Sequence, residues 1–283
     1  MSDNPPGLVA DSSASALKAQ LDDVWTSLGT LGAGLSDADW RAPTSCPGWS
    51  VAAQYAHVVG TESMILGRPN PEVDPGRPEH VRNDIGGFNE AWVVSLASEP
   101  RESVLARLAE VTSDRRAAMA GMTEEDFVAP SWTPIGQADY RRFMQIRVFD
   151  CWVHEQDVRD AVGRPGHDDG PVAEQAVDEI VRALGYIVGK KAAAPPGSSL
   201  RISLTGPVKR DIEVAVVDGR ARAVAGLDTS PTTTVTMSST AFTRLASGRV
   251  AAASVMGGAF GGVTLAGDTT FGERIVAALP FTI

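Results

Sequence analysis

The spacing of apolar residues changes near residue 200, and this change constrains the fold more than any other feature of the chain. Between residue 14 and about residue 190, apolar side chains recur every three or four positions, which is the period of an amphipathic helix. Beyond "AAAPPGSS" at 192–199, apolar and polar residues alternate, as in a half-buried strand. One chain therefore predicts two architectures in succession, helices first and a sheet second.

Turn residues set the expected boundaries of these two parts. We expect a disordered lead-in at 1–13, a helical domain at 14–191, a linker at 192–199 and a small α+β domain at 200–283. Antiparallel helices with connections of mixed length predict a four-helix bundle with an added helix. The expected helices of the first domain are 15–32, 51–66, 85–98, 102–121, 139–162 and 171–191, with a loop at 128–136. The second domain is expected to contain strands at 200–206, 211–219, 222–226, 232–238 and 261–268, and helices at 239–249 and 269–279.

Composition excludes several classes of partner. The formal net charge is -10, and so acidic a surface repels phosphate backbones, which argues against a nucleic-acid partner. The sequence has no apolar run long enough for a membrane span, and the polar start "MSDNPPGLVADSSASA" is not that of a secretory signal. Cys46 and Cys151 form neither a CxxC pair nor a disulfide framework. These features predict a reduced, cytoplasmic protein.

The segment 139–162 places ionisable side chains along one face of its expected helix. Steps of three and four residues connect Arg147, Asp150, His154 and Asp157, and bulky apolar residues flank this stripe. Buried charges are costly unless they are paired or bound to a metal. This helix alone therefore leaves two interpretations open, an internal ion network and part of a metal site.

A second signal comes from His57, whose neighbours one helical turn away are small or polar. Such surroundings leave room for a ligand, although a lone histidine on such a face is more often a hydrogen-bonded structural residue. Two imidazoles and one carboxylate, from His57, His154 and Asp150, suit zinc in a site with an open position, and other divalent transition metals accept the same set. Cys151 is an alternative to Asp150 as the ligand.

Two stretches together resemble a known family. "TSCPGWSVAAQYAHVVGTE" at 44–62 and "IRVFDCWVHEQDVRDAVGRPG" at 146–166 are similar to the metal-binding segments of the mycothiol-dependent maleylpyruvate isomerase family, a branch of the DinB-like four-helix bundles. "LASGRV" and "LAGD" are similar to the family's C-terminal domain, which is distantly similar to sterol carrier proteins. The resemblance implies a DinB-like metal-binding bundle followed by a sterol-carrier-like α+β domain.

The resemblance also implies roles for individual residues. His57, Asp150 and His154 match the metal ligands, with Asp150 at a position that is glutamate in the isomerase itself. Asp157 matches an acid implicated in thiol binding, and Arg82 lies where the family lines its pocket.

The implied cofactors are a divalent metal, most simply zinc, and mycothiol, a small cysteine-containing thiol. No catalytic side chain is implied beyond the metal-bound thiol. Arg147 is a candidate to hold a carboxylate of the substrate or cofactor, and a salt bridge to a nearby acid is the alternative. The implied substrate is a small electrophile or unsaturated acid, and the shorter side chain of Asp150 favours an S-transferase or other thiol chemistry over isomerisation of maleylpyruvate.

Two further readings of the sequence remain. In one, the metal only stabilises the bundle and the C-terminal domain binds an apolar ligand without catalysis. In the other, the ionisable stripe is a metal-free salt-bridge network. An open metal position favours the enzyme, and a fourth protein ligand favours a structural site.

Overall fold

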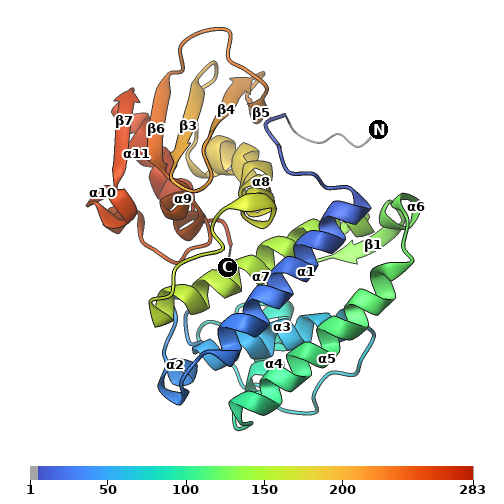
Figure 1. The fold of residues 1–283 in the computed structure, drawn as a ribbon. Coiled ribbons are helices and arrows are strands. Elements are labelled where there is room, and N and C mark those ends of the chain that lie inside the picture. The colour runs from blue at the N-terminus through green and yellow to red at the C-terminus, as the bar shows by residue number, and fades with distance from the viewer. Residues whose placement is uncertain (1–5, 283) are drawn as a thin grey trace. The chain divides into compact units, whose positions relative to one another are not determined.

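Four long helices, α1 (Ala14–Ala33), α3 (Val51–Ile65), α5 (Arg101–Ala120) and α7 (Tyr140–Val162), form the N-terminal bundle in the computed structural model (Figure 1). The structure describes residues 6–282, which divide into two units, one of residues 11–167 and one of residues 168–282 together with residues 6–10. No helix among residues 6–282 is long and apolar enough to cross a membrane.

The bundle closes because each long helix packs on two of the others. Helix α1 contacts α5 and α7, and α3 contacts the same two helices from the other side. Their shared core is built of large apolar side chains that are almost completely buried, among them Leu17, Leu21, Trp25, Leu28, Tyr55, Leu108, Met144 and Trp152. The predicted four-helix bundle is confirmed.

Shorter elements connect the bundle helices. They are α2 (Asp37–Arg41), α4 (Asp84–Leu96), α6 (Glu124–Phe127), β1 (Pro130–Thr133) and β2 (Gly136–Asp139). Strands β1 and β2 pair as an antiparallel hairpin, so the expectation of an irregular loop at 128–136 was wrong. Thr133 and Gly136 close this hairpin, and Asp139 then caps α7 by accepting a hydrogen bond from the backbone of Arg142.

The second unit contains a five-stranded sheet in the order β5-β4-β3-β6-β7. Its strands are β3 (Ser199–Thr205), β4 (Arg210–Val217), β5 (Arg220–Val224), β6 (Thr233–Ser238) and β7 (Val263–Gly267). Strands β3 and β6 are parallel and the other pairs are antiparallel. The helical elements are α8 (Gly170–Tyr186), η1 (Ile187–Lys191), α9 (Ser239–Ala246), α10 (Ala252–Met256), η2 (Ala259–Gly261) and α11 (Thr269–Ala278). The predicted α+β domain is confirmed.

Helix α8 belongs to the unit of the sheet, whereas the sequence pattern placed it with the bundle. Its buried face, which includes Ile180 and Val181, packs against β5, and a side chain at Gly185 would lie 2.9 Å from the carbonyl oxygen of Ala221. The division of the chain therefore precedes α8 instead of following it. A helical period shows that a face is buried, but it does not show what buries it.

The expected lead-in at 1–13 falls partly outside the described residues, which begin at Pro6. Within the described part, the backbone N–H groups of Val9 and Ala10 both donate to Asp178 Oδ2, at 3.0 and 2.9 Å. Ser13 then caps α1 by accepting from the backbone of Ala16. Residues 9–13 thus have specific contacts, and the expectation of disorder does not hold for them.

The contact between α3 and α4 depends on a glycine. A Cβ at Gly60 would lie 2.4 Å from Cγ of Trp92, so alanine there forces the two helices apart. We expect Gly60→Ala to lower the free energy of unfolding by about 1–3 kcal/mol, as overpacked cores do. Gly87→Ala, in α4 with no atom within 4 Å, is the matched control and stabilises by up to about 1 kcal/mol. Urea denaturation measures both, and an unchanged stability in Gly60→Ala would contradict the tight contact.

Candidate metal centre

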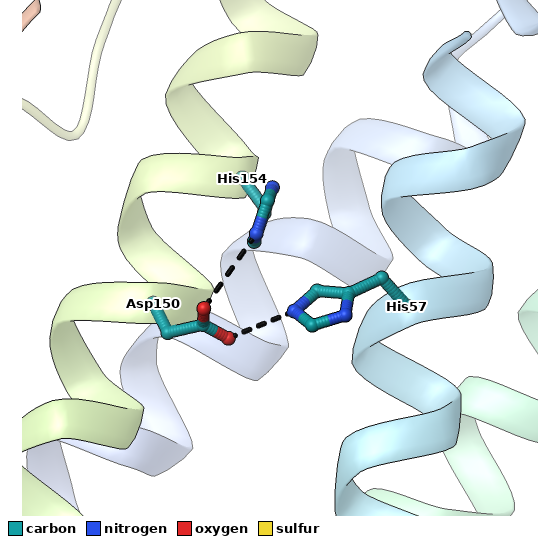
Figure 2. Close-up of side chains that lie close together, drawn as sticks. All are labelled: His57, Asp150 and His154. Carbon is teal, nitrogen blue, oxygen red and sulfur yellow. Dashed lines mark hydrogen bonds and ion pairs between the residues drawn. The ribbon is translucent and has the colours of Figure 1, made fainter. Parts of the chain in front are cut away.

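Three side chains from two neighbouring helices converge inside the bundle. His57 on α3 and Asp150 and His154 on α7 each offer one atom, and these atoms all lie within 4.8 Å of one another. Figure 2 shows the carboxylate of Asp150 between the two rings, with one oxygen directed at each. Asp150 Oδ2 lies 3.0 Å from His57 Nε2, and Asp150 Oδ1 lies 3.6 Å from His154 Nε2.

Local sequence explains this convergence. Asp150 and His154 are four residues apart and therefore share a face of α7, while packing between α3 and α7 brings His57 opposite them. Both histidines are buried, whereas the side chain of Asp150 keeps 29% of its surface exposed. A small molecule would therefore reach the cluster from the side of Asp150.

His154 is oriented by two oxygen atoms on its far side. Its Nδ1 lies 2.5 Å from Gln54 Oε1 and 3.3 Å from Asp157 Oδ2. Since both partners accept hydrogen bonds, Nδ1 donates to them, and Nε2 is the ring nitrogen that faces the cluster. His57 differs, because its Nδ1 is buried without a hydrogen-bond partner.

A row of alternating charges continues from Asp150 into the core. The guanidinium of Arg147 bonds to Asp150 Oδ2 and also donates to Glu62 Oε1, at 2.8 Å from Nη2. Glu62 has no exposed surface, and its other oxygen accepts from Arg115 Nε at 2.8 Å. Arg115 in turn contacts the hydroxyl of Tyr140. Burial of these charges is tolerable because each has partners of opposite sign.

The pKa directions follow from burial and these partners. Burial would raise the pKa of Asp150, but His57 and Arg147 hold it well below its usual range, so Asp150 is a carboxylate. Burial lowers the pKa of His57 and favours the neutral ring, the form that binds metals. Burial also acts to lower the pKa of His154, but hydrogen bonds to Asp150 and Asp157 raise it, so a proton competes with a metal for this ring.

The donor set and its spacing fit a divalent metal. Tetrahedral zinc with bonds of about 2.0–2.1 Å to nitrogen and oxygen places its ligand atoms about 3.3 Å apart. Asp150 Oδ2 is 3.0 Å from His57 Nε2 and Asp150 Oδ1 is 3.6 Å from His154 Nε2, and one donor atom from each residue lies within 4.8 Å of the other two, so the cluster approaches this spacing. Three protein donors leave a fourth position for another ligand. The same contacts also form an ion cluster without metal, so metal content is the property that separates the two interpretations.

The structure places the other expected site residues as follows. Asp157 lies beside His154 with only 1% of its surface exposed, and Arg147 is buried between Asp150 and Glu62. Arg147 therefore forms salt bridges with Asp150 and Glu62, which was the alternative to a role in holding a substrate or cofactor carboxylate. Arg82 is exposed just before α4 and makes none of the contacts described for the cluster.

Cys151 does not replace Asp150 in the cluster. Its Sγ accepts from Arg147 Nη2 at 3.1 Å and lies 3.8 Å from Glu62 Oε1. Burial raises the pKa of this thiol, which disfavours the thiolate that a metal requires.

Several residues of the site had no distinct signal in the sequence. Gln54, Glu62 and Trp49 were visible as polar or aromatic neighbours of the second helix, but spacing did not select them. Gln54 precedes His57 by three residues, yet its partner is His154, on a different helix. Glu62 similarly pairs with residues of α5 and α7. Only the packing of helices reveals such pairs.

The fold and the site define a helical-bundle protein with a His–Asp–His cluster, joined to an α+β domain. Residues 21–159 match the family model described as the mycothiol maleylpyruvate isomerase N-terminal domain. Residues 21–159 therefore support the resemblance to the mycothiol-dependent maleylpyruvate isomerase family that the sequence motifs predicted.

One curated relative and two solved structures are similar to this chain. Uncharacterized protein Rv0036c of Mycobacterium tuberculosis (strain H37Rv) is 27% identical over 219 residues, covering 72% of this chain and 75% of that one. A crystal structure of the mycothiol-dependent maleylpyruvate isomerase is 14% identical and covers 89% of this chain and 92% of its own, with a TM-score of 0.56. A mutant of that isomerase is 15% identical, covers 84% and 90%, and has a TM-score of 0.53. At these identities the two structures show a shared fold.

The buried charge row predicts a large cost for removing its central acid. Glu62→Gln leaves Arg147 and Arg115 as cations without their shared carboxylate, and we expect a loss of about 3–5 kcal/mol in the free energy of unfolding. Asp114→Asn breaks the exposed contact to Arg68 and is expected to cost about 1 kcal/mol or less. Chemical denaturation at neutral pH compares them. Equal costs for the two variants would show that the row contributes no more than a surface pair.

A second buried acid on α7 predicts a pH dependence of stability. Glu155 has no exposed surface and contacts His167 Nδ1 at 2.7 Å. Burial would lower the pKa of His167, but the hydrogen bond and charge of Glu155 raise it. Because the pKa of His167 is higher in the folded protein than in the unfolded chain, protonation of this ring stabilises the fold. This contribution is complete at pH values below the unfolded-state pKa and is lost as the pH rises through the folded-state pKa.

We therefore expect His167→Gln to lower the melting temperature more at about pH 6 than at about pH 8.5, on either side of an ordinary histidine pKa. Thermal unfolding of wild type and variant at both pH values measures this difference. Asp23→Asn, which removes an exposed carboxylate 3.5 Å from the same ring, is the control and should show a smaller pH effect. A deficit in His167→Gln that does not change with pH would contradict the ion pair.

Proposed function

We propose that this protein is a mycothiol-dependent metalloenzyme in which His57, Asp150 and His154 hold a divalent metal, most simply zinc. The observation that carries the proposal is the proximity of the three donors, together with the orientation of His154, whose Nε2 faces the cluster while its Nδ1 contacts Gln54 and Asp157. The match to the isomerase family model supports the choice of mycothiol as the thiol.

When bound, such a metal lowers the pKa of a coordinated thiol, so that the thiol is held as a nucleophilic thiolate. The three side chains contribute one formal negative charge, and Arg147 beside Asp150 offsets it. The site consequently favours an anion in its remaining position. The residues of the chain thus select the charge of the cofactor group they bind.

Cys151, which is adjacent to Asp150 in the chain, does not compete with a cofactor thiol as the nucleophile. Cys151 is buried, its pKa is raised, and its sulfur faces Arg147 and Glu62. The reaction we propose is therefore attack by the bound cofactor thiol on a small electrophile or unsaturated acid, which approaches past the exposed side of Asp150. A thiol held there would suit an isomerisation, in which its addition to a double bond is reversed, or an S-transfer by addition, in which its sulfur and its proton both remain on the acceptor.

We favour S-transfer over isomerisation of maleylpyruvate. Asp150 occupies a position at which the resemblance implies glutamate in the isomerase, and its shorter carboxylate lies closer to the backbone of α7. The ion pair between Asp150 and Arg147 adds a further constraint on where this carboxylate lies. Arg147 is thereby committed to Asp150 and Glu62, and we assign it to charge balance instead of substrate binding.

Metal content tests the proposal. We expect about one divalent metal per chain in wild type, as a three-ligand site requires, and at least a tenfold loss in His57→Ala and in His154→Ala. His167→Ala is the matched control, because that histidine contacts Glu155 outside the cluster and should retain full occupancy. Elemental analysis after reconstitution with zinc gives the stoichiometry.

Cobalt-loaded protein then reports on the open position. Addition of mycothiol should produce a sulfur-to-cobalt charge-transfer band in wild type. Wild type without metal after reconstitution would refute the metalloenzyme and leave an ion network. Bound metal without the band, even at saturating thiol, would indicate a metal that only stabilises the bundle.

A further inference from the structure

Trp49 contacts both histidines of the cluster. The centroid of its ring lies 5.3 Å from that of His57 and 5.7 Å from that of His154, with interplanar angles of 41° and 36°. The ring is buried, and it belongs to the segment just before α3. One aromatic side chain therefore forms a common wall for two rings that come from different helices.

The two histidines differ in whether a hydrogen bond from Nδ1 orients the ring. Gln54 and Asp157 fix the ring of His154 through its Nδ1. His57 has a buried Nδ1 that finds no hydrogen-bond partner among residues 6–282, so no comparable contact within this part of the chain fixes its far side. Ligand histidines ordinarily donate from their second nitrogen, and this donation sets the angle of the ring. For His57, packing against Trp49 takes the place of that hydrogen bond.

The position of Trp49 is fixed by a carboxylate on another helix. Trp49 Nε1 donates to Glu90 Oε2 at 3.0 Å, and His80 Nε2 donates to the same oxygen at 2.9 Å. Glu90 lies on α4 and is buried, and the two hydrogen bonds offset the cost of burying its carboxylate. Its hydrogen bond prevents rotation of the indole ring.

His80 adds a second contact to the segment of Trp49. A Cβ at Gly48 would lie 2.5 Å from His80 Nδ1, which shows that the imidazole of His80 lies directly against the backbone of that glycine. Gly48 has φ +78°, a conformation that favours glycine, so the close approach and the turn require the same residue. His80 thus contacts both Glu90 and the residue before Trp49.

We propose that Glu90 and His80 are positioning residues that act through Trp49 to orient the ring of His57 in the metal site. This inference rests on the proposed function for the identity of the ligand, but the orientation of His57 is a property of the metal-free protein as well. Partners outside the ligand shell commonly change metal affinity by about 10–100-fold. Glu90 reaches the site through one intervening side chain and is expected to fall in that range.

The test measures zinc affinity, by competition with a chromophoric chelator, and the imidazole ¹⁵N NMR signals of the metal-free protein. Glu90→Ala should weaken zinc binding about 10–100-fold and displace the signals of His57. Glu90→Gln keeps an oxygen that accepts from Trp49 and should recover most of the affinity. Trp49→Phe keeps an aromatic ring at this position but removes the indole N–H that donates to Glu90, so it should resemble Glu90→Ala. Val94→Ala, at an exposed position of the same helix, is the control.

The outcomes separate this inference from the proposed function. Wild-type affinity and unmoved His57 signals in Glu90→Ala, with wild type binding zinc, would overturn the positioning role alone. Wild type that binds no zinc would overturn the proposed function. The His57 signals of the metal-free variants would then decide whether Glu90 positions His57. Their displacement in Glu90→Ala and Trp49→Phe, with no change in Val94→Ala, would support positioning, and unmoved signals would refute it. Thermal unfolding of each metal-free variant verifies that it is folded.

Discussion

Buried charge between α3 and α7 is the constraint on which the rest of the bundle depends. His57, Asp150, Arg147, Glu62 and Arg115 follow one another through the core, each beside a partner that complements its charge or hydrogen-bonding capacity. A single unpaired member would leave a charge in an apolar interior, which costs several kcal/mol. The helices must therefore pack in a register that satisfies every member. The same register brings together the three donors of the candidate site.

The site is asymmetric in how it holds its two imidazoles. Hydrogen bonds from His154 to Gln54 and Asp157 restrain this ring, whereas packing against Trp49 restrains His57. Hydrogen bonds also set the proton distribution of a ring, and packing sets only its orientation. The two imidazoles therefore differ electronically, with a raised pKa for His154 because of its carboxylates and a lowered pKa for His57 because of burial. Such a site combines one electron-rich ligand with one that is easily kept neutral.

Much of the site was predictable from the sequence because it lies on regular helices. Asp150 and His154 are four residues apart, and this spacing alone puts them on one face. The resemblance to the family supplied His57 as their partner, and the structure brings all three together. Asp157 and Arg147 were placed on the correct face, but their roles depend on contacts that the spacing does not specify. Asp157 lies behind His154, and Arg147 lies against Glu62, which belongs to α3.

The sequence by itself determined the periodicity of each part, and with it the bundle, the alternating strands and the stripe of ionisable groups on α7. These are local properties, since the repeat of a helix or strand is set by backbone geometry. Tertiary structure decided which surfaces meet. It grouped α8 with the sheet, because the apolar face of this helix packs on β5. It also joined Trp49, Glu90 and His80 beside the cluster, since side chains from three separate segments become neighbours only when the helices pack.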